Sequence, residues 1–141
     1  MYETIFCRNQ LHKYMTKEEV TKLLNIYGKA WVTRDPDLIV TIFTPEATYN
    51  DPHEPENIGR DAIRACWVSK VVGEQKDIVF DLKHVWIDGG VETSSPNGML
   101  NLQTQYRNLR IQMDEVAIFQ TRDGEFSSLR EYYKSVKTPL V

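Results

Sequence analysis

Hydrophobic residues recur at helical spacing through the first part of the chain. Thr16, followed three residues later by Glu19, forms a capping box, which is typical of a helix start. The apolar residues behind it predict an amphipathic helix over about residues 17–33; they are Val20, Leu23, Leu24, Tyr27, Ala30 and Trp31. Asp35-Pro36 is an N-cap followed by a proline at the first helical position, and it predicts a second, short helix. The apolar face of that helix consists of Leu38, Ile39, Ile42 and Phe43.

A short strand, a loop and a third helix follow. Residues 47–50 predict a strand that ends at Asp51-Pro52, and a proline-rich loop leads from there to Gly59. The next helix has one apolar side, formed by Ile63, Trp67, Val68 and Val71.

The period changes to two from Asp77 onward, which predicts strands. One face of the first strand consists of Ile78, Phe80, Leu82, His84 and Trp86, and Asp88-Gly89-Gly90 ends it. Further strands are expected at about 99–107, 110–120 and 125–133, with a loop at 91–98 and a hairpin turn at Asp123-Gly124. Helices first and antiparallel strands afterwards indicate an α+β fold, with helices on the concave face of one curved antiparallel sheet and an apolar hollow between the layers. We expect one domain over residues 16–141, preceded by a poorly ordered arm at 1–15.

Composition narrows the classes of function. The formal net charge is −3 and the lysines are scattered among acids, which argues against a nucleic-acid binder and favours small-molecule chemistry. Two cysteines are too few for a disulfide framework, and their spacing does not suit a metal. Neither a signal peptide nor an apolar run of about 20 residues is recognisable, so we expect a cytoplasmic protein without membrane contact.

Three polar residues are candidates for chemistry, each with a structural alternative. His84 shares its predicted face with apolar residues, where burial would keep the imidazole neutral as an acid or base; the alternative is a core histidine bonded to the backbone. Asp51 lies at the expected mouth of the hollow, where its carboxylate could move protons; the alternative is an Asp-Pro turn. The phenol of Tyr27 could support an oxyanion, or could simply be a large core residue.

Other sites have weaker signals. Asp51, His53 and Glu54 lie close together but lack the regular spacing of metal ligands, so no metal is expected. No phosphate-binding glycine loop, dinucleotide fingerprint or serine elbow is present, so no organic cofactor is expected either. We expect the hollow to be lined by Trp31, Phe43, Tyr49, Trp67 and Trp86.

The order of elements and several short motifs resemble the NTF2-like superfamily, especially its SnoaL-like and ketosteroid-isomerase-like members. The motifs are Tyr27 to Trp31, Arg34 to Asp37, Phe43 to Tyr49, Asn50 to Pro52, Gly59 to Arg64, Gly124 and Leu129 to Tyr133. The resemblance implies a cone-shaped α+β fold, pairing of two copies through the outer sheet face, and a pocket for a small apolar ligand.

Roles carry over only in part. In ketosteroid isomerases a tyrosine of the first helix is the oxyanion donor and the aspartate of an Asp-Pro pair is the base; Tyr27 and Asp51 match these places. A protonated acid on the penultimate strand falls at Val116 or Ala117 when counted back from Gly124, so we expect this donor to be missing. His84 also resembles the strand histidine of scytalone dehydratase.

Three hypotheses follow. The first is a cofactor-independent isomerase, cyclase or dehydratase of a small hydrophobic carbonyl compound, with Asp51 as base, His84 as second acid or base and Tyr27 as oxyanion donor. The second is a non-catalytic protein that binds a small apolar ligand through the same residues. The third is a module whose sheet serves mainly to form a homodimer.

Overall fold

The computed structural model describes residues 15–89 and 94–140, which form three helices, a π-helical segment and six strands. The helical elements are α1 (Lys17–Thr33), α2 (Pro36–Val40), α3 (Arg60–Cys66) and the π-helix η2 (Trp67–Val72). The strands are β1 (Phe43–Asn50), β2 (Asn57–Ile58), β3 (Gln75–Gly89), β4 (Ser94–Tyr106), β5 (Leu109–Arg122) and β6 (Glu125–Pro139). None of the helices among these residues is long and apolar enough to cross a membrane.

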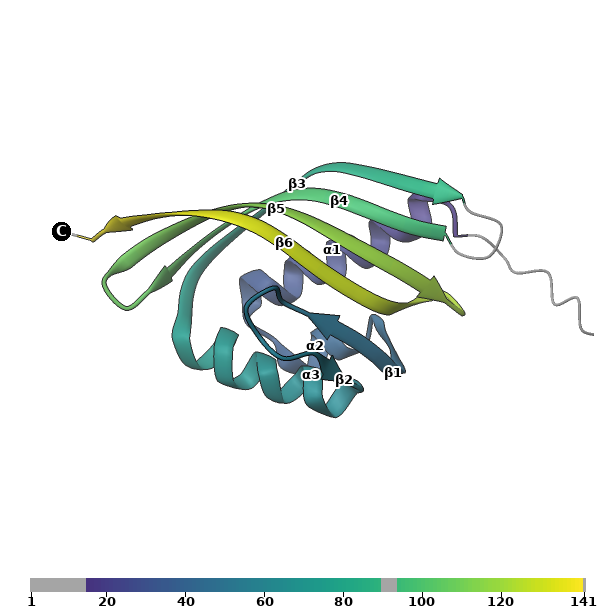
Figure 1. The fold of residues 1–141 in the computed structure, drawn as a ribbon, viewed down its shortest axis with the longest axis horizontal. Coiled ribbons are helices and arrows are strands. Elements are labelled where there is room, and N and C mark those ends of the chain that lie inside the picture. Colours follow the sequence, from purple (N-terminus) through teal and green to yellow (C-terminus); the bar gives the residue numbers. More distant parts are fainter. Residues whose placement is uncertain (1–14, 90–93, 141) are drawn as a thin grey trace, which may run out of the picture.

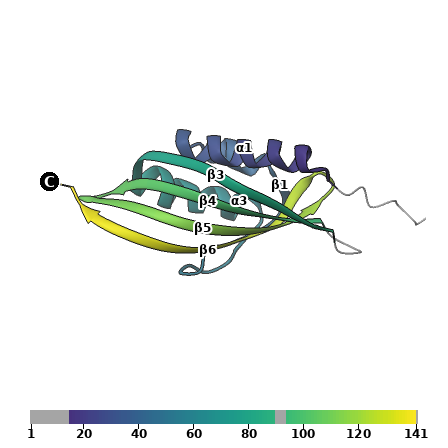
Figure 2. The same cartoon turned by 90° about the horizontal axis from the view of Figure 1, so that it is seen from above.

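The strands form one curved sheet in the order β2-β1-β6-β5-β4-β3, with the helices on its concave side (Figure 1). The view from above shows α1 lying along that side beside β3 (Figure 2). The predicted α+β cone is confirmed, with one difference in the sheet. Strand β1 pairs with β6 in parallel, with Tyr49 opposite Leu129, so the sheet is mixed rather than wholly antiparallel. This pairing brings β1, from the first third of the chain, beside β6, which comes from its C-terminal part.

Both predicted helix starts are confirmed by their caps. The Thr16 hydroxyl accepts a hydrogen bond from the Glu19 N–H, and the Glu19 carboxylate accepts one from the Thr16 N–H. The Asp35 carboxylate accepts from the N–H groups of Asp37 and Leu38, with Pro36 at the start of α2. The core lies between α1 and the sheet, where Tyr27 packs edge-on against Phe80 and Phe119.

Several element boundaries differ from the sequence prediction. Strand β1 begins at Phe43, four residues before the predicted start, so Phe43 is a buried strand residue rather than part of a helix face. The third helix continues beyond Cys66 as η2, and there Val68 is 43% exposed rather than on the buried side. Residues 94–98, predicted as loop, belong to β4. The predicted arm lies outside the described residues except for Met15, and so does the segment 91–93 of the predicted loop.

A β-bulge in β3 reverses the alternation of its side chains. Leu82 pairs with Leu100 and His84 pairs with Met99, so β3 contains one extra residue, Lys83, at this point. Before the bulge, Ile78 and Leu82 face the helices; after it, Val85 and Ile87 do, as their burial shows. A one-residue shift moves every following side chain to the other face. His84 and Trp86 therefore lie on the outer face of the sheet.

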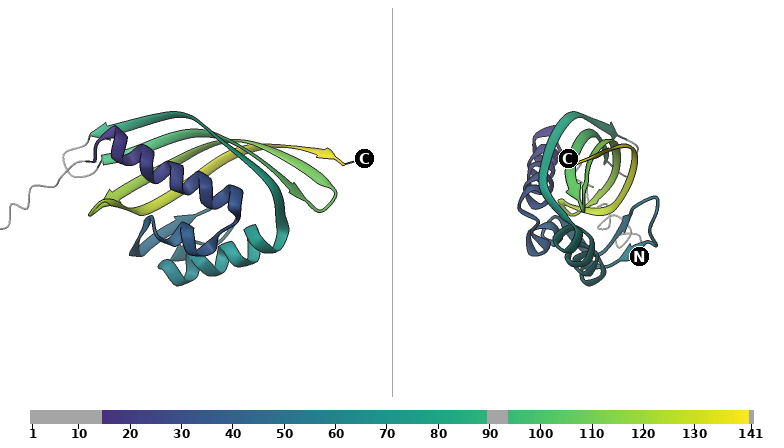
Figure 3. Two further views of the ribbon diagram at one scale, coloured as in Figure 1. Left: turned by 180° about the vertical axis from the view of Figure 1, so that it is seen from behind. Right: turned by 90° about the vertical axis from the view of Figure 1, so that its left-hand side faces the viewer.

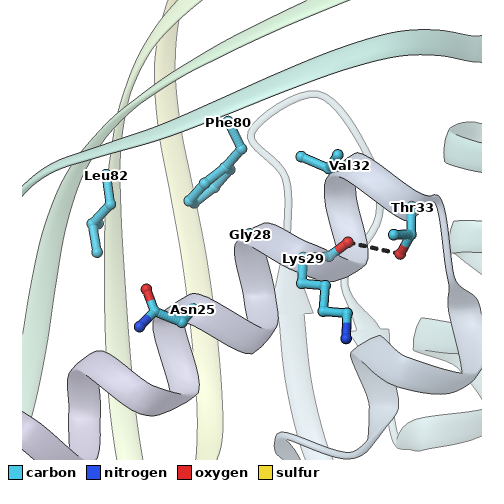
Figure 4. A pocket seen from close by; sticks show the side chains of 7 residues that line it. All are labelled: Asn25, Gly28, Lys29, Val32, Thr33, Phe80 and Leu82. Carbon is cyan, nitrogen blue, oxygen red and sulfur yellow. Dashed lines mark hydrogen bonds between the residues drawn. The ribbon is translucent and has the colours of Figure 1, made fainter.

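Helix α1 lies against β3, as the view from behind shows (Figure 3), and their close packing depends on Gly28, which faces Phe80 (Figure 4). A Cβ atom on Gly28 would lie 2.5 Å from Cδ1 and 2.7 Å from Cε1 of Phe80. We predict that Gly28→Ala lowers the free energy of unfolding by about 1–3 kcal/mol, although alanine is the better helix former, because the Phe80 ring must move. Urea unfolding measures this loss.

The double variant Gly28→Ala/Phe80→Leu is the matched test of that cause. If the Phe80 ring is the obstacle, Gly28→Ala should cost less free energy in the Phe80→Leu background than in the wild-type protein. An equal cost in both backgrounds would contradict the explanation.

Candidate acid–base site

Two buried carboxyl groups lie on the concave face of the last two strands. Glu115 of β5 and Glu131 of β6 are each 4% exposed. Their strands place them there by alternation: Glu115 is in step with Ala117, and Glu131 is in step with Leu129. Because Ala117 pairs with Glu131, the two glutamates are diagonal neighbours across the β5–β6 ladder. Carboxyl groups are almost never fully buried unless they are paired, so this pair requires an explanation.

Glu131 is held by two phenols from different elements. Its Oε1 atom accepts a short hydrogen bond from the Tyr27 hydroxyl of α1 and one of 2.7 Å from the Tyr49 hydroxyl of β1. Both tyrosines are buried, with 0% and 4% exposure. The ring of Trp31, one turn beyond Tyr27, packs edge-on against the Tyr27 ring. The carboxylate therefore links α1 and β1 to β6.

Burial dominates the titration of both glutamates. It raises the pKa of Glu131 from 4.5 to about 7, although the hydrogen bonds from Tyr27 and Tyr49 oppose the rise; the charge of Asp51 adds to it. The pKa of Glu115 lies well above its usual value, first through burial and then through the charges of Glu131 and Asp51. Among the described residues, no positive charge contributes to the pKa of either carboxyl group. The raised values indicate groups that can carry a proton near neutral pH.

The cluster reaches solvent at the end of β1. Asp51, which directly follows β1, is half-buried, and the Tyr133 hydroxyl of β6 lies 3.4 Å from both of its carboxylate oxygens. The Asp51 carboxylate also accepts a 2.8 Å hydrogen bond from the His53 N–H, which is the turn interaction considered as its structural alternative. The ring of His53 lies 5.5 Å from that of Tyr133. Asp51 therefore forms the expected turn and also influences the pKa values of both glutamates.

The structure brings together part of the predicted site. Tyr27, Tyr49 and Asp51 all lie around Glu131. Three of the predicted lining residues, Trp31, Phe43 and Trp67, are buried in the core, where the rings of Trp31 and Trp67 lie 4.5 Å apart. The indole N–H of Trp67 is buried without a partner within the described part of the chain.

His84 and Trp86 are not part of this cluster. His84 is exposed and stacks on Trp86, which is itself 48% exposed. The predicted inward orientation of both side chains was wrong. Its cause is the bulge at Lys83, which no local sequence signal marks, because apolar residues occupy both faces of β3 around it.

Sequence reasoning missed Glu115, Glu131 and Tyr133. The signal was present in the alternation of the last two strands, where Glu115 is in step with Phe119, and Glu131 with Leu129. Counting back from Gly124 places the acid of the penultimate strand at Val116 or Ala117, one or two residues after Glu115. Because Glu115 is buried, the penultimate strand does hold an inward-facing acid, contrary to the prediction.

Two surface hollows lie elsewhere among the described residues. One, of about 350 Å³, lies between α1 and β3 and is lined by Asn25, Gly28, Lys29, Val32, Thr33, Phe80 and Leu82 (Figure 4). The other, of about 210 Å³, lies beside Cys66 and Lys70. Neither is lined by Asp51 or by the two buried glutamates.

The sequence matches the SnoaL-like domain family over residues 24–129, well over half of the chain. The chain belongs to this family. Tyr27, Tyr49, Asp51 and Glu115 lie inside the matched segment of this SnoaL-like protein, whereas Glu131 lies two residues beyond it. Comparison with curated proteins gives no match.

Solved structures with the same fold include several enzymes. A hexachlorocyclohexane dehydrochlorinase, LinA type 2, superposes with a TM-score of 0.77 at 14% identity, covering 89% of this chain and 88% of that one. SalBIII, an epoxide hydrolase/cyclase-like enzyme of pyran ring formation in salinomycin, gives 0.68 at 22% identity, with 85% and 95% covered. An epoxide hydrolase from M. tuberculosis gives 0.68 at 14% identity, with 83% and 84% covered. At these identities the likeness shows the fold.

Glu131 makes the stability of the protein depend on pH. Because its folded-state pKa of about 7 exceeds the usual 4.5, the folded state holds a proton that the unfolded state has already released. Stability is therefore greatest below pH 4.5 with respect to this group and falls as the pH rises through about 7, by about 3 kcal/mol in total. Glu115 acts in the same direction. We predict that Glu131→Gln removes much of this fall between pH 5 and pH 8, as measured by urea unfolding.

Glu56→Gln, at an exposed position, is the control for that experiment and should keep the wild-type dependence on pH. A wild-type stability that rises from pH 5 to pH 8 would contradict the assignment of a raised pKa to Glu131.

Proposed function

We propose that this protein is a cofactor-independent acid–base enzyme, an isomerase, cyclase or dehydratase, that acts on a small and mainly apolar carbonyl compound. The observation that carries the proposal is the buried Glu131 carboxyl group, which two phenols hold in place and whose pKa is about 7. A carboxyl group with such a pKa is half-ionised at neutral pH, which suits a group that both takes and returns protons. Perturbed pKa values of this kind concentrate at functional sites.

The neighbouring groups supply the other half of the chemistry. In the proposed reaction, ionised Glu131 takes a proton from the carbon next to the carbonyl group, and the electron pair moves onto the carbonyl oxygen. Glu115, which burial keeps protonated, donates a hydrogen bond to that oxygen. Glu131 then returns its proton to another carbon in an isomerisation, or to a departing hydroxyl group that leaves as water in a dehydration. The protons and electron pairs balance without an added cofactor.

Tyr27 and Asp51 take different roles from those the family resemblance implied. The Tyr27 hydroxyl donates to Glu131, so we propose that it positions the base and lowers its pKa rather than binding the substrate oxygen. Asp51 lies half-buried beside Tyr133, and we propose that this pair passes protons between Glu131 and solvent. The ligand itself would lie against the aromatic residues beside Asp51.

The family and its relatives support this class of activity. LinA type 2 is a dehydrochlorinase, and the M. tuberculosis relative is an epoxide hydrolase. Both names describe reactions of small molecules on this fold. A non-catalytic ligand-binding module is the alternative, and it would use the same residues. Only a measurement of turnover distinguishes it from an enzyme.

Proton exchange on carbon tests the proposal without knowledge of the natural substrate. Small cyclic ketones, such as cyclohexanone and 2-tetralone, are incubated with the protein in D2O, and exchange of the hydrogens next to the carbonyl group is followed by NMR. We expect exchange above the buffer rate, and we expect Glu131→Gln to reduce it by about 10²-fold or more. Asp114→Asn, on the outer face of the same strand as Glu115, should leave the rate unchanged.

The pH profile separates catalysis from a merely structural effect. The exchange rate should rise through about pH 7, the pKa of Glu131. In Tyr27→Phe this inflection should move to higher pH, because a hydrogen bond that lowers that pKa is lost. A folded Glu131→Gln variant with the wild-type rate would overturn the proposal.

We also propose a second copy of the chain as a partner, bound through the outer face of the sheet. Trp86, Val116 and Tyr132 are exposed there by 38–48%, and Val116 pairs with Tyr132 across the β5–β6 ladder. An exposed apolar group of this kind marks an interaction surface. We predict a homodimer in sedimentation equilibrium that Val116→Asp weakens by at least about tenfold. A wild-type protein that is monomeric at about 100 μM would contradict this prediction.

A further inference from the structure

We infer that the acid–base site selects its ligand by charge, and that it accepts a small organic cation, such as a protonated amine, in preference to a neutral or anionic compound of the same shape. The inference deepens the proposed function, because it states the charge of the carbonyl compound that the same site would accept. It rests on three features of the described residues, which are the charges around the site, one carboxyl oxygen without a partner, and the aromatic surroundings.

The charge of Asp51 influences both Glu115 and Glu131, and no cation among the described residues contributes to the pKa of either glutamate. Asp51 follows β1, Glu115 belongs to β5 and Glu131 to β6. Helix α1 contributes neutral groups, Tyr27 and Trp31. His53 is exposed beside Tyr133, near Asp51.

Three arginines bond other partners, and one lysine on the same face of β6 lies far along the strand. Arg60 bonds Glu125, Arg64 bonds Asp37, and Arg34 bonds the carbonyl groups of Val72 and Gln75. Lys137 follows Glu131 on the same face of β6, but six residues of strand separate them by about 20 Å. An anionic ligand would therefore meet like charges, whereas a cation would meet opposite ones.

One acceptor in the site has no partner within the described part of the protein. Oε1 of Glu115 is buried and makes no hydrogen bond among these residues. Leaving such a group unsatisfied destabilises the folded protein, and more so when the group is charged. An ammonium N–H at this place would satisfy the oxygen, while the protonated Glu115 keeps its own O–H as a donor. The unpaired Oε1 of Glu115 thus indicates that a bound ligand supplies the donor.

The surroundings favour an organic cation over a metal ion. Within residues 15–89 and 94–140, no three His, Cys, Asp or Glu side chains converge closely enough to hold a metal. The acids are instead interleaved with the rings of Tyr27, Tyr49 and Tyr133. Aromatic rings attract organic ammonium groups through the negative faces of their π-systems, while they supply no ligand that a hard metal ion prefers.

Binding of a cation should release protons. Desolvation and the charge of Asp51 raise the pKa of Glu131 to about 7, so that about half of this group holds a proton at pH 7, whereas a bound ammonium group favours its ionised form. Glu115, whose pKa is raised further, stays protonated, and Tyr27, Tyr49 and Tyr133 also face the carboxyl groups but have raised pKa values, so they remain neutral throughout. The released protons therefore come from Glu131. Proton release is a readout that adsorption at the protein surface would not produce.

Three compounds with one ring test the inference by calorimetry at pH 7: cyclohexylamine, cyclohexanol and cyclohexanecarboxylate. We expect the amine to bind at least about tenfold more tightly than the alcohol, and the carboxylate to bind most weakly. Repeating the amine titration in phosphate and in HEPES should give different heats, because protons released on binding are taken up by buffers of different ionisation enthalpy. Glu115→Gln and Glu131→Gln should each reduce the preference for the amine, and Asp114→Asn should preserve it.

Two outcomes would overturn the inference. One is an alcohol that binds as tightly as the amine, and the other is an amine preference that survives in the folded Glu115→Gln/Glu131→Gln protein. Since the heats of the wild-type protein in two buffers need no variant, the test remains decisive if a variant fails to fold. Binding is measured without turnover, so cation preference in a protein that exchanges no ketone hydrogens would overturn the proposed function alone.

Discussion

The buried carboxyl group of Glu131 is the constraint on which the rest of the structure depends. An ionised carboxylate in an apolar interior is costly unless hydrogen bonds compensate it. Here the hydroxyl groups of Tyr27 and Tyr49 provide that compensation, and they come from α1, which packs against β3, and from β1, which pairs with β6. The two bonds thereby set how the first helix and the first strand sit on the last strand. Removing the carboxylate would leave two buried phenols without their acceptor.

In the same arrangement, hydrogen bonds compensate the charge of Glu131 only in part. A basic side chain beside Glu131 would stabilise its charge, but it would also lower the pKa and make the carboxyl group a weak base. The described residues around it instead add a second acid, Glu115, and a third, Asp51. The site thus retains groups that give up and regain protons near neutral pH, at the cost of some folding stability. This compromise is typical of sites that perform chemistry.

Local signals in the sequence were sufficient for the layers but not for every side-chain direction. Capping at Thr16 and Asp35 and the change of period near Asp77 predicted the helices, the strands and the α+β class. The direction of His84 depended on the extra residue at Lys83, and a bulge is determined by the partner strand rather than by local composition. The parallel pairing of β1 with β6 is likewise a long-range property. Glu115 and Glu131 could have been found, because simple alternation along β5 and β6 already placed them on the buried face.

The pairing of β1 with β6 has a consequence for how the protein is made. The hydroxyl groups of Tyr27 and Tyr49 are 104 and 82 residues away from the carboxylate that they bind. During synthesis, α1 and β1 leave the ribosome long before the last strand does, so the Tyr27 and Tyr49 hydroxyl groups and the pairing edge of β1 must wait for a partner that arrives late in translation. Contacts of such sequence separation form slowly. The nascent chain therefore has a window in which its half-built core is open to chaperones and to aggregation, and a message that stops after β5 would encode a protein without its central acid.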